Sequence, residues 1–551
     1  MAKTSDSASS IHENGDATPD AAAAAPAEVA VIAEGESGEG GKMKMIVQLV
    51  KRCLGVKDIA AMRLSLPASL LEPLPNLEYW NYLDRPDLFA AINDSADPFE
   101  RMLAVLRFTF SKDLKFIRGK ICKPYNSVLG EHFRAHWVVN ELTYPPEFPR
   151  VPPTIEAHLH HPHGAPIPEL PIDDSDAGGS QWSSDAVSLK SSKSNNARQP
   201  APDRGASSIK SGADSGFLSV GGGDKKMAAS AEDVSKLGEG LEQLNVEFKE
   251  ELDDPEDFKD AEDEKDEDGV RVIFLTEQIS HHPPASDYYF AAPDKGVEAF
   301  GVDQISAKVS GTTVRITPGS MNKGIFISIT SGHGAGEEYH ITHPAAHVNG
   351  ILRGNFYATM TDSTIITCTN SKSGQNLRAI IDYKEESWLG RPQFLVDGCI
   401  HTYDADPTKR EWDAWTKVKY VPPKNVVATF DGSWRKKIEW KKAGSTTPNT
   451  LIDIDMLSLV PKSVRPLSQQ LPNESRKLWE GVTTNLLSKN FNEATKVKQV
   501  IEQKQRDIAA QRKATGKEFV PVYFEADISS GKPVLTEAGR KAVQDELKTR
   551  L

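Results

Sequence analysis

Between residues 269 and 403, apolar and polar positions alternate in short runs. Such alternation is typical of strands that place one face on a core, and Gly, Asn, Asp or Ser separate the runs. The runs are Val270–Ile279, Gly301–Val309, Thr312–Thr317, Ile325–Thr330, Ile351–Thr359, Ser363–Thr369, Ala379–Tyr383 and Gln393–Ile400. They recur about every ten residues, which predicts antiparallel strands in a sandwich or a barrel. The alternation alone does not distinguish the two.

Other segments have the spacing of amphipathic helices. A helical pattern covers Asn76–Phe110 and Asn492–Gln511. A shorter one covers residues 42–56, with basic residues beside an apolar face made of Ile46, Leu49, Val50, Cys53 and Leu54. The short pattern predicts a helix packed on a domain edge, or else a mobile lid or a helix that touches an anionic membrane.

Two segments contain too few apolar residues to form a core. Residues 1–41 are rich in Ala, Ser, Glu and Gly, and residues 164–268 are rich in Ser, Gly, Ala, Lys and acids. We predict a disordered leader (1–41) and a disordered insertion (164–268) that expands a hairpin loop in place. Such an insertion costs little stability, because loop-closure entropy grows only logarithmically with length. The folded part then comprises residues 42–163, the main β region 269–420 and a mostly helical region 421–551.

The net charge of −13 is concentrated in residues 247–268, which contain 14 acids and three lysines. The rest of the chain is close to neutral and has basic clusters, so contact with anionic membranes stays open. The four cysteines form no C-x-x-C pair, and the histidines at 158, 160, 161 and 163 have no acidic or cysteine partner at ligand spacing. We therefore predict no metal site and no disulfide framework. No run of about 18 apolar residues occurs, and we expect a cytosolic protein.

The stretch Glu277–Pro284 (EQISHHPP) closes the apolar run Val270–Leu275. If the strand continued to His282, the two imidazoles would point to opposite faces. If a bulge or turn began there, both could reach one ligand. A hydrolase would need a nucleophile or a metal beside the histidines, and Glu277 with Ser280 on one short strand makes no triad. We therefore do not expect an enzyme.

This octapeptide resembles the signature of the oxysterol-binding-protein-related lipid carriers, in their short fungal form. Residues 123–131 (KPYNSVLGE) resemble a second motif of that family, K-P-x-N-x-x-L-G-E, with Ser127 where proline is usual. A third row is Lys498, Glu502 and Arg506, spaced four residues apart on one helical face.

The resemblance implies an α+β fold: a large, near-closed antiparallel β-barrel with a hydrophobic tunnel, an N-terminal lid helix and a C-terminal helical subdomain. Residues 42–163 would then hold the lid and the first part of the lipid-binding domain. The resemblance also implies a phosphatidylinositol 4-phosphate headgroup site made of Lys123, Asn126, His281, His282, Lys498, Glu502 and Arg506. Cationic side chains and hydrogen-bond donors bind phosphate groups through charge-assisted hydrogen bonds. Lipids would be the ligands, with no cofactor and no nucleic acid partner.

The implied function is exchange of sterol for phosphatidylinositol 4-phosphate between membranes. Tyr125 and the segment 66–73 are more similar to carriers of phosphatidylserine, whereas Tyr79-Trp80 and Arg101–Val105 are more similar to the small fungal sterol carriers. We favour sterol, with phosphatidylserine as the alternative. A phosphoinositide sensor or scaffold with little transfer would share the same site residues.

Within the acidic run, Asp257, Phe258, Asp260 and Ala261 resemble the FFAT motif, by which proteins dock on VAP receptors of the endoplasmic reticulum. Lys259 stands where that motif usually has an aromatic residue. The acids would steer the segment to a basic surface, and Phe258 would fill a pocket. This predicts a peripheral membrane protein at endoplasmic reticulum contact sites.

Overall fold

A computed structural model describes the chain in several ranges. These are residues 68–118, 121–153, 269–310, 313–350, 357–371, 376–386, 391–406 and 408–549, residue 374, and short pieces between residues 30 and 65. The four histidines between 158 and 163, the acidic run and the FFAT-like residues Asp257, Phe258, Asp260 and Ala261 lie outside these ranges. So do Ile46, Val50 and Leu54 of the predicted lid.

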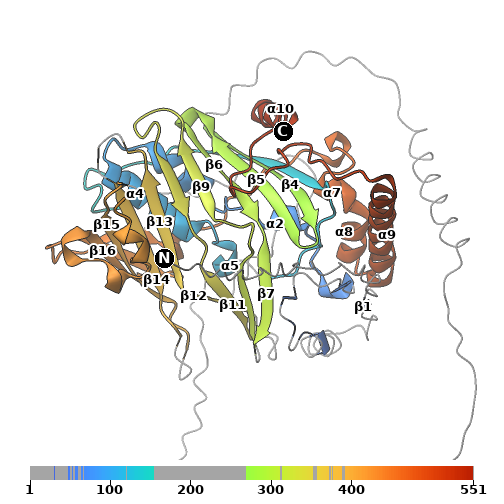
Figure 1. The fold of residues 1–551 in the computed structure, drawn as a ribbon, viewed down its shortest axis with the longest axis horizontal. Coiled ribbons are helices and arrows are strands. Elements are labelled where there is room, and N and C mark those ends of the chain that lie inside the picture. Colours follow the sequence, from blue (N-terminus) through green and yellow to red (C-terminus); the bar gives the residue numbers. More distant parts are fainter. Residues whose placement is uncertain are drawn as a thin grey trace, which may run out of the picture. The chain divides into compact units, whose positions relative to one another are not determined.

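The main element is an antiparallel sheet of 12 strands with the order β18-β17-β16-β15-β14-β13-β10-β9-β6-β5-β4-β3 (Figure 1). Its strands, in chain order, are β3 (His132–Val139), β4 (Val270–His281), β5 (Pro284–Ala292), β6 (Val297–Asp303), β9 (Ile325–Ile329), β10 (Glu338–Ile341), β13 (Ser363–Thr369), β14 (Leu377–Tyr383), β15 (Leu395–Thr402), β16 (Val426–Ser433), β17 (Lys437–Lys442) and β18 (Asn449–Asp453). The predicted meander is confirmed.

Two smaller sheets accompany it. One has the order β12-β11-β8-β7, and the other pairs β1 with β2 in parallel. Their strands are β1 (Ala30–Val31), β2 (Leu64–Ser65), β7 (Ile305–Ser310), β8 (Thr313–Pro318), β11 (Ala345–Asn349) and β12 (Tyr357–Thr361). Next to the predicted lid, the Ile59 amide donates to the Ala307 carbonyl (2.7 Å), which fastens this part of the chain to β7.

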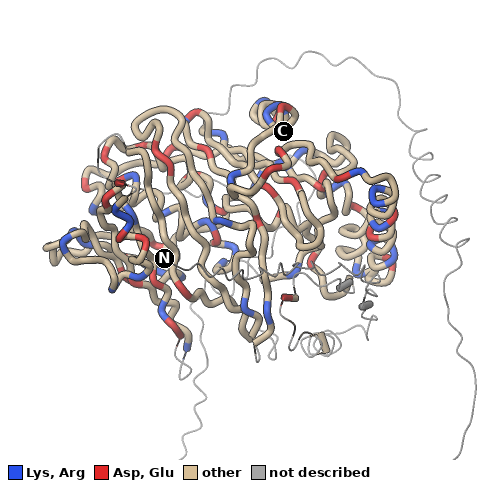
Figure 2. The backbone as a smooth tube through the Cα atoms, in the orientation of Figure 1, with Lys and Arg blue, Asp and Glu red and all other residues tan. Residues whose placement is uncertain are grey.

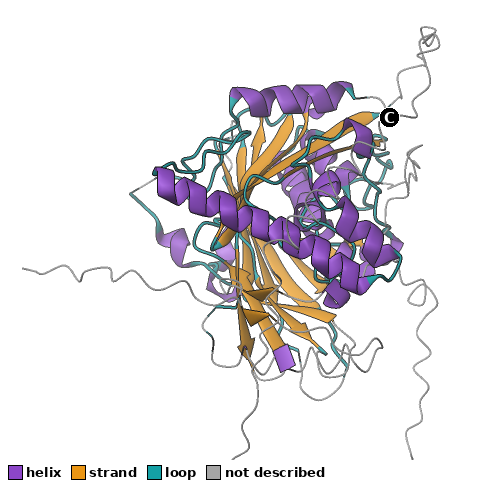
Figure 3. Cartoon of the chain, turned by 90° about the vertical axis from the view of Figure 1, so that its right-hand side faces the viewer, coloured by secondary structure: helices purple, strands orange, loops and turns teal. Residues whose placement is uncertain are grey.

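Helices from the N-terminal part of the chain pack on one face of the main sheet, and helices from the C-terminal part lie at its β3 side (Figures 1 and 3). They are α2 (Asn76–Tyr79), α3 (Pro86–Ala90), α4 (Pro98–Ser111), α5 (Lys115–Arg118), α7 (Ser475–Leu478), α8 (Glu480–Leu487), α9 (Phe491–Thr515) and α10 (Glu537–Lys548). Asp97 caps α4 by accepting from the Phe99 amide (2.8 Å), and Pro98 occupies the first turn, where no N–H is needed.

Strand β4 is buried on both faces, which explains its unbroken apolar run. Val272 and Phe274 point into the large core that contains α4, whereas Ile273 and Leu275 point to the opposite face. There α10 and Phe524 cover them. Because apolar residues face inward on both sides, this strand reads as continuous rather than alternating.

Among the described strands, β3 and β18 form the two edges of the main ladder. The chain after β18 reaches β3, where Ser463 and His136 exchange two backbone hydrogen bonds (2.7 and 3.1 Å). The sheet also continues past residue 420, because β16, β17 and β18 pair onto β15 in turn. The boundary between a β region and a helical region is therefore better placed near residue 453.

Strands β3 and β4 pair antiparallel with Val139 opposite Val270. They are sequential in the sheet although about 130 residues separate them in the chain. Strands β3 and β4 are therefore the two antiparallel arms that this long segment connects.

Candidate functional site

The loop 121–131 is fixed by a buried tyrosine. The Tyr125 ring packs against Trp479 with 5.0 Å between centroids, and its hydroxyl is 2.9 Å from the Thr483 hydroxyl. The Tyr125 amide donates to the Leu74 carbonyl (3.1 Å). With this side chain inside, the neighbours Lys123 and Asn126 are exposed at the rim of the loop.

Glu131 ends this loop and has no exposed surface. Its carboxylate accepts from the Ser475 hydroxyl (2.7 Å), the Trp479 indole (3.0 Å) and the Val128 amide (3.0 Å). Burial raises the pKa of Glu131 to about 7. The carboxyl thus joins the loop to α7 and α8. The sequence shows Glu131 only as the last letter of a motif, because its two side-chain partners, Ser475 and Trp479, are more than 340 residues away.

Lys123 and Asn126 form one unit at the rim. The Lys123 ammonium donates to Oδ1 of Asn126 (2.7 Å) and to the Pro124 carbonyl (3.1 Å). Protein atoms displace water around part of this side chain, and that desolvation lowers the pKa of Lys123 to about 8. The positive charge of Lys498 contributes to the same lowering, so Lys498 of α9 lies near enough to act on this loop.

The histidine pair lies in a tight hairpin between β4 and β5. The register shifts between Gln278 and Ser280, and His281 pairs with Pro284. The two imidazole centroids are 4.4 Å apart, which agrees with the bulge-or-turn alternative and not with the pleated one. Nδ1 of His281 donates to the Ser127 carbonyl (3.2 Å), which connects the hairpin to the Lys123 loop.

Two further contacts attach the end of β4 to its surroundings. The Gln278 amide donates to the Glu131 carbonyl (2.8 Å), and the Gly130 amide donates back to the Gln278 carbonyl (2.9 Å). The buried Glu277 carboxylate accepts from the amides of Val522 and Tyr523 (both 2.8 Å). The motif glutamate therefore anchors the C-terminal segment instead of facing a ligand.

Helix α9 brings the third motif to the loop. Lys498 is buried and pairs with Glu502 (2.6 Å). Arg506 is exposed and donates from Nε to Oε1 of Gln503 (3.0 Å). Glu502 therefore holds Lys498, while Arg506 is oriented by a neighbour on its own helix. Figure 2 shows that basic and acidic residues alternate along α9.

Of the predicted lid residues that are described, Cys53 is buried and Leu49 is half-buried. Both belong to helical pieces, since residues 48, 49 and 53 are helical. The lid itself remains a prediction.

A partly buried polar cluster beside the main core has no counterpart in the sequence motifs. The Tyr82 hydroxyl donates to Oδ1 of Asp303 (2.5 Å), and the Lys112 ammonium lies 5.4 Å above the Tyr82 ring. Burial raises the pKa of Asp303 to about 7, and burial lowers the pKa of His343, which stacks on Tyr82, to about 3. No sequence pattern predicted this cluster, because its four residues come from separate segments of the chain.

Within the described ranges, no helix is both long and apolar enough to cross a bilayer, and no cluster of three or more metal-ligating side chains occurs.

Comparison with known proteins identifies the family. A family model described as oxysterol-binding protein matches residues 45–164 and 256–542. Oxysterol-binding protein-like protein 1 of Schizosaccharomyces pombe is 39% identical over 519 residues, which is 93% of each chain. Oxysterol-binding protein homolog 6 of Saccharomyces cerevisiae is 29% identical over 254 residues, covering 46% of this chain and 52% of the relative.

Crystal structures of the Osh1 ORD domain with cholesterol and with ergosterol share the fold, with TM-scores of 0.50 and 0.51. Each is 16% identical and covers 91% of this chain and 88% of its own. The long match to the family model, the fungal relative matched along nearly its whole length and the shared fold agree, and the chain belongs to the oxysterol-binding protein family.

Proposed function

We propose that this protein extracts a lipid from one membrane into its interior and exchanges sterol for phosphatidylinositol 4-phosphate between membranes. One observation carries the proposal. Three separate elements, the loop 121–131, the β4–β5 hairpin and helix α9, bring donors together at one end of the sheet. In this proposal Lys123, Asn126, His281, His282 and Lys498 bind the phosphates, Glu502 orients Lys498, and Arg506 contributes from the rim.

The chemistry of the headgroup matches this set. A phosphorylated inositol lipid carries one phosphate in its chain linkage and one on its ring, and ammonium and imidazolium groups bind phosphates through charge-assisted hydrogen bonds. The pair Lys123 and Lys498 concentrates positive charge in a partly desolvated place, where repulsion already lowers the Lys123 pKa. An anion would relieve that repulsion.

The sterol side of the proposal rests on the interior. The Osh1 domain that shares this fold binds cholesterol and ergosterol. A sterol is apolar except for one hydroxyl, and the half-buried Asp303 with the buried Tyr82 offers polar groups beside an apolar core. Burying apolar lipid surface gains about 25 cal/mol per Å². The near-closed barrel, its tunnel and the lid over it are parts of this proposal.

Transfer would take place from the cytosol, with peripheral contact to membranes. The FFAT-like residues 257–261 would tether the chain to a VAP receptor, which a binding assay with the peptide 245–268 tests. Equal affinity of the intact peptide and its Phe258→Ala form would refute the tether.

The headgroup site is tested by the double variant His281→Ala/His282→Ala. We expect it to lose phosphatidylinositol 4-phosphate extraction from vesicles, since both imidazoles leave the site, while the unfolding temperature changes little. His333→Ala, which removes an exposed imidazole from a turn elsewhere, is the matched control. Normal extraction by the double variant would remove the histidines from the site.

A further inference from the structure

Strands β15 and β16 are adjacent in the sheet, yet 23 residues separate them. A hairpin needs only about two to five residues at such a place. The connection, residues 403–425, instead runs along the outer face of the sheet and contains three short 3-10 helices: η6 (Glu411–Ala414), η7 (Val418–Tyr420) and η8 (Pro423–Asn425).

Specific contacts hold this excursion in place. The Arg378 guanidinium donates to the Trp412 carbonyl (2.6 Å) and lies 4.9 Å from the Trp412 ring. The Val418 amide donates to Oδ2 of Asp382 (3.0 Å), and the buried Val421 packs on β14 and β15. These hydrogen bonds and packing contacts fix both the backbone and several side chains of residues 403–425. The side chains of its second half, the tip Lys417–Lys424, therefore have a defined orientation.

The two halves of the excursion differ in charge. The first half contains four acids, and its cations Lys409 and Arg410 pair with Asp404, Asp406 and Asp413. From residue 414 to residue 430 the sequence contains no acid and three lysines, Lys417, Lys419 and Lys424. In the described part of the chain, none of these three lysines has an acidic partner within ion-pair distance.

An aromatic ring accompanies these lysines. Tyr420 is 50% exposed, and the Lys419 ammonium lies 5.1 Å from its ring. Pro423 and Lys424 are exposed next to it. Tyrosine beside lysine is the combination that proteins use at the boundary between water and a bilayer, where the ring sits among headgroups and the ammonium binds anionic lipids.

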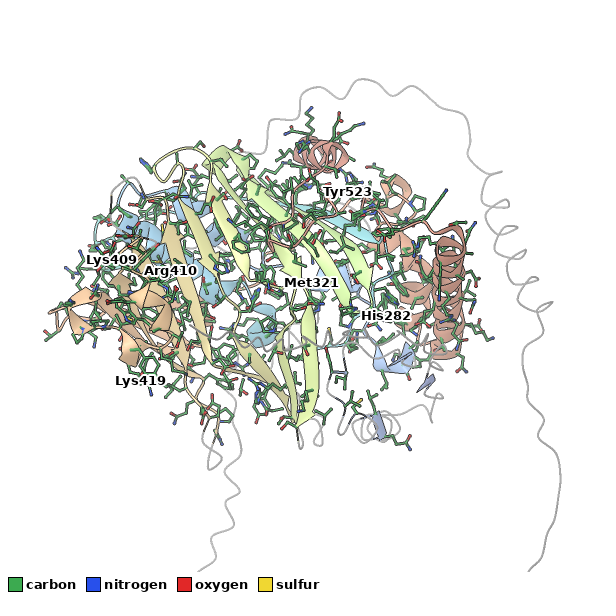
Figure 4. The ribbon with its side chains drawn as sticks, in the orientation of Figure 1. His282, Met321, Lys409, Arg410, Lys419 and Tyr523 are labelled. Atoms are coloured by element: carbon green, nitrogen blue, oxygen red, sulfur yellow. The ribbon has the colours of Figure 1, made fainter. Side chains whose placement is uncertain are left out.

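The direction of the strands places this tip at the end of the sheet that carries the histidine hairpin. From β14 to β4 the ladder makes six antiparallel steps, so both strands run in the same direction. Asp382, which holds Val418, lies at the C-terminal end of β14, as His281 does in β4. Figure 4 shows Lys419 and His282 toward the same, lower side of the view, on opposite flanks of the sheet.

We infer that the tip Lys417–Lys424 is a second contact for an anionic bilayer, remote from the histidine hairpin. The inference rests on the proposed function, because it assumes that the hairpin end faces the membrane. Two contacts on opposite flanks would fix the tilt of the molecule on the bilayer, which one contact cannot do. An anionic bilayer is favoured over an acidic peptide because the exposed ring would join the lysines in the interface.

The test uses the full chain and sedimentation with vesicles of phosphatidylcholine, with or without phosphatidylserine. Lys419→Gln/Lys424→Gln should bind the anionic vesicles on the order of 25-fold more weakly, since each of the two lysines near such a surface contributes about a fivefold factor. Tyr420→Ser should weaken binding less, and to both kinds of vesicle. Lys409→Gln/Arg410→Gln removes two charges from the same excursion and is the matched control.

If both double variants lost the same amount of binding to anionic vesicles, the attraction would be a general effect of charge and the inference would be wrong. Unchanged vesicle binding by Lys419→Gln/Lys424→Gln would also overturn it. Loss of binding to a 247–268 peptide with normal vesicle binding would assign the tip to an acidic peptide instead. Lipid uptake from detergent micelles, read by native mass spectrometry, should be normal in all variants. If the wild type takes up no lipid, the proposed function fails, whereas the vesicle comparison still decides the docking surface.

Discussion

At the scale of single residues, the lowered pKa of Lys123 predicts that headgroup binding at the proposed site depends on pH. Desolvation brings this pKa to about 8, so the ammonium loses its proton as the pH rises through that value. Affinity for phosphatidylinositol 4-phosphate should therefore fall between about pH 7 and 9. Lys123→Arg keeps its charge over this range and should flatten the profile. Binding isotherms at several pH values measure this, and parallel profiles for both proteins would exclude Lys123 as the titrating group.

Asp287 should limit stability at high pH. It lies directly opposite Glu277 in the β4–β5 ladder, is fully buried, and neither carboxylate oxygen has a hydrogen-bond partner among the described residues. Burial first, and then the charge of Glu277, raise the pKa of Asp287 to about 8.

The unfolded chain releases this proton near pH 4, whereas the folded chain holds it to about pH 8. The free energy of unfolding should therefore decline across that window and level off above it. Asp287→Asn should unfold at a higher temperature than the wild type above pH 6, with the difference vanishing near pH 4. Thermal scans across this range test it, and a constant difference would contradict the assignment.

At the scale of elements, one glycine lets β15 and β16 approach around an aromatic ring. Gly398 pairs with Phe430, and a Cβ at Gly398 would overlap the Phe430 ring, which is almost fully buried. Gly398→Ala should therefore lower the free energy of unfolding by about 1–3 kcal/mol, a typical cost of overpacking. Thr429→Ala, an exposed change on the neighbouring strand β16, is the control. Adding Phe430→Leu should recover part of the loss in denaturant titrations.

The sequence predicted elements best where local pattern decides them. Strand β13 was predicted as Ser363–Thr369 and has these bounds, and the helix predicted from Asn492 extends from Phe491 to Thr515. Strand β5 was not among the predicted runs, because prolines cannot donate to a ladder and Pro283-Pro284 open this segment; in the structure Pro284 begins the returning strand of a hairpin. Strands β10 and β11 are too short for alternation to stand out.

The candidate site also combines residues that local motifs indicate with residues that only the tertiary fold brings together. Motifs in the sequence indicated Lys123, the two histidines and Lys498 as candidate site residues, but the residues that hold them in position were not predictable. Glu131 meets Trp479 across 348 positions, and Glu277 meets Tyr523 across 246. Such pairs depend on the tertiary fold, and no periodicity in the chain encodes them.

At the scale of the whole molecule, the β3–β4 register predicts that residues 164–268 are dispensable for folding. Val139 and Val270 are already paired, so a short Gly/Ser linker in place of 164–268 closes the same hairpin. The shortened chain should unfold within about 3 °C of the wild type, because loop-closure entropy changes slowly with length. Loss of cooperative unfolding, monitored by circular dichroism, would show that this segment contributes to the fold.

The same register has a consequence for synthesis on the ribosome. Strand β3 leaves the ribosome about 130 residues before β4, and Ser463, which binds its other edge, follows far later. At about 5–20 residues per second, β3 waits on the order of ten seconds for its first partner. During that time its apolar residues and unpaired amides are open to aggregation. The length of the insertion therefore sets how long the nascent chain needs protection by chaperones.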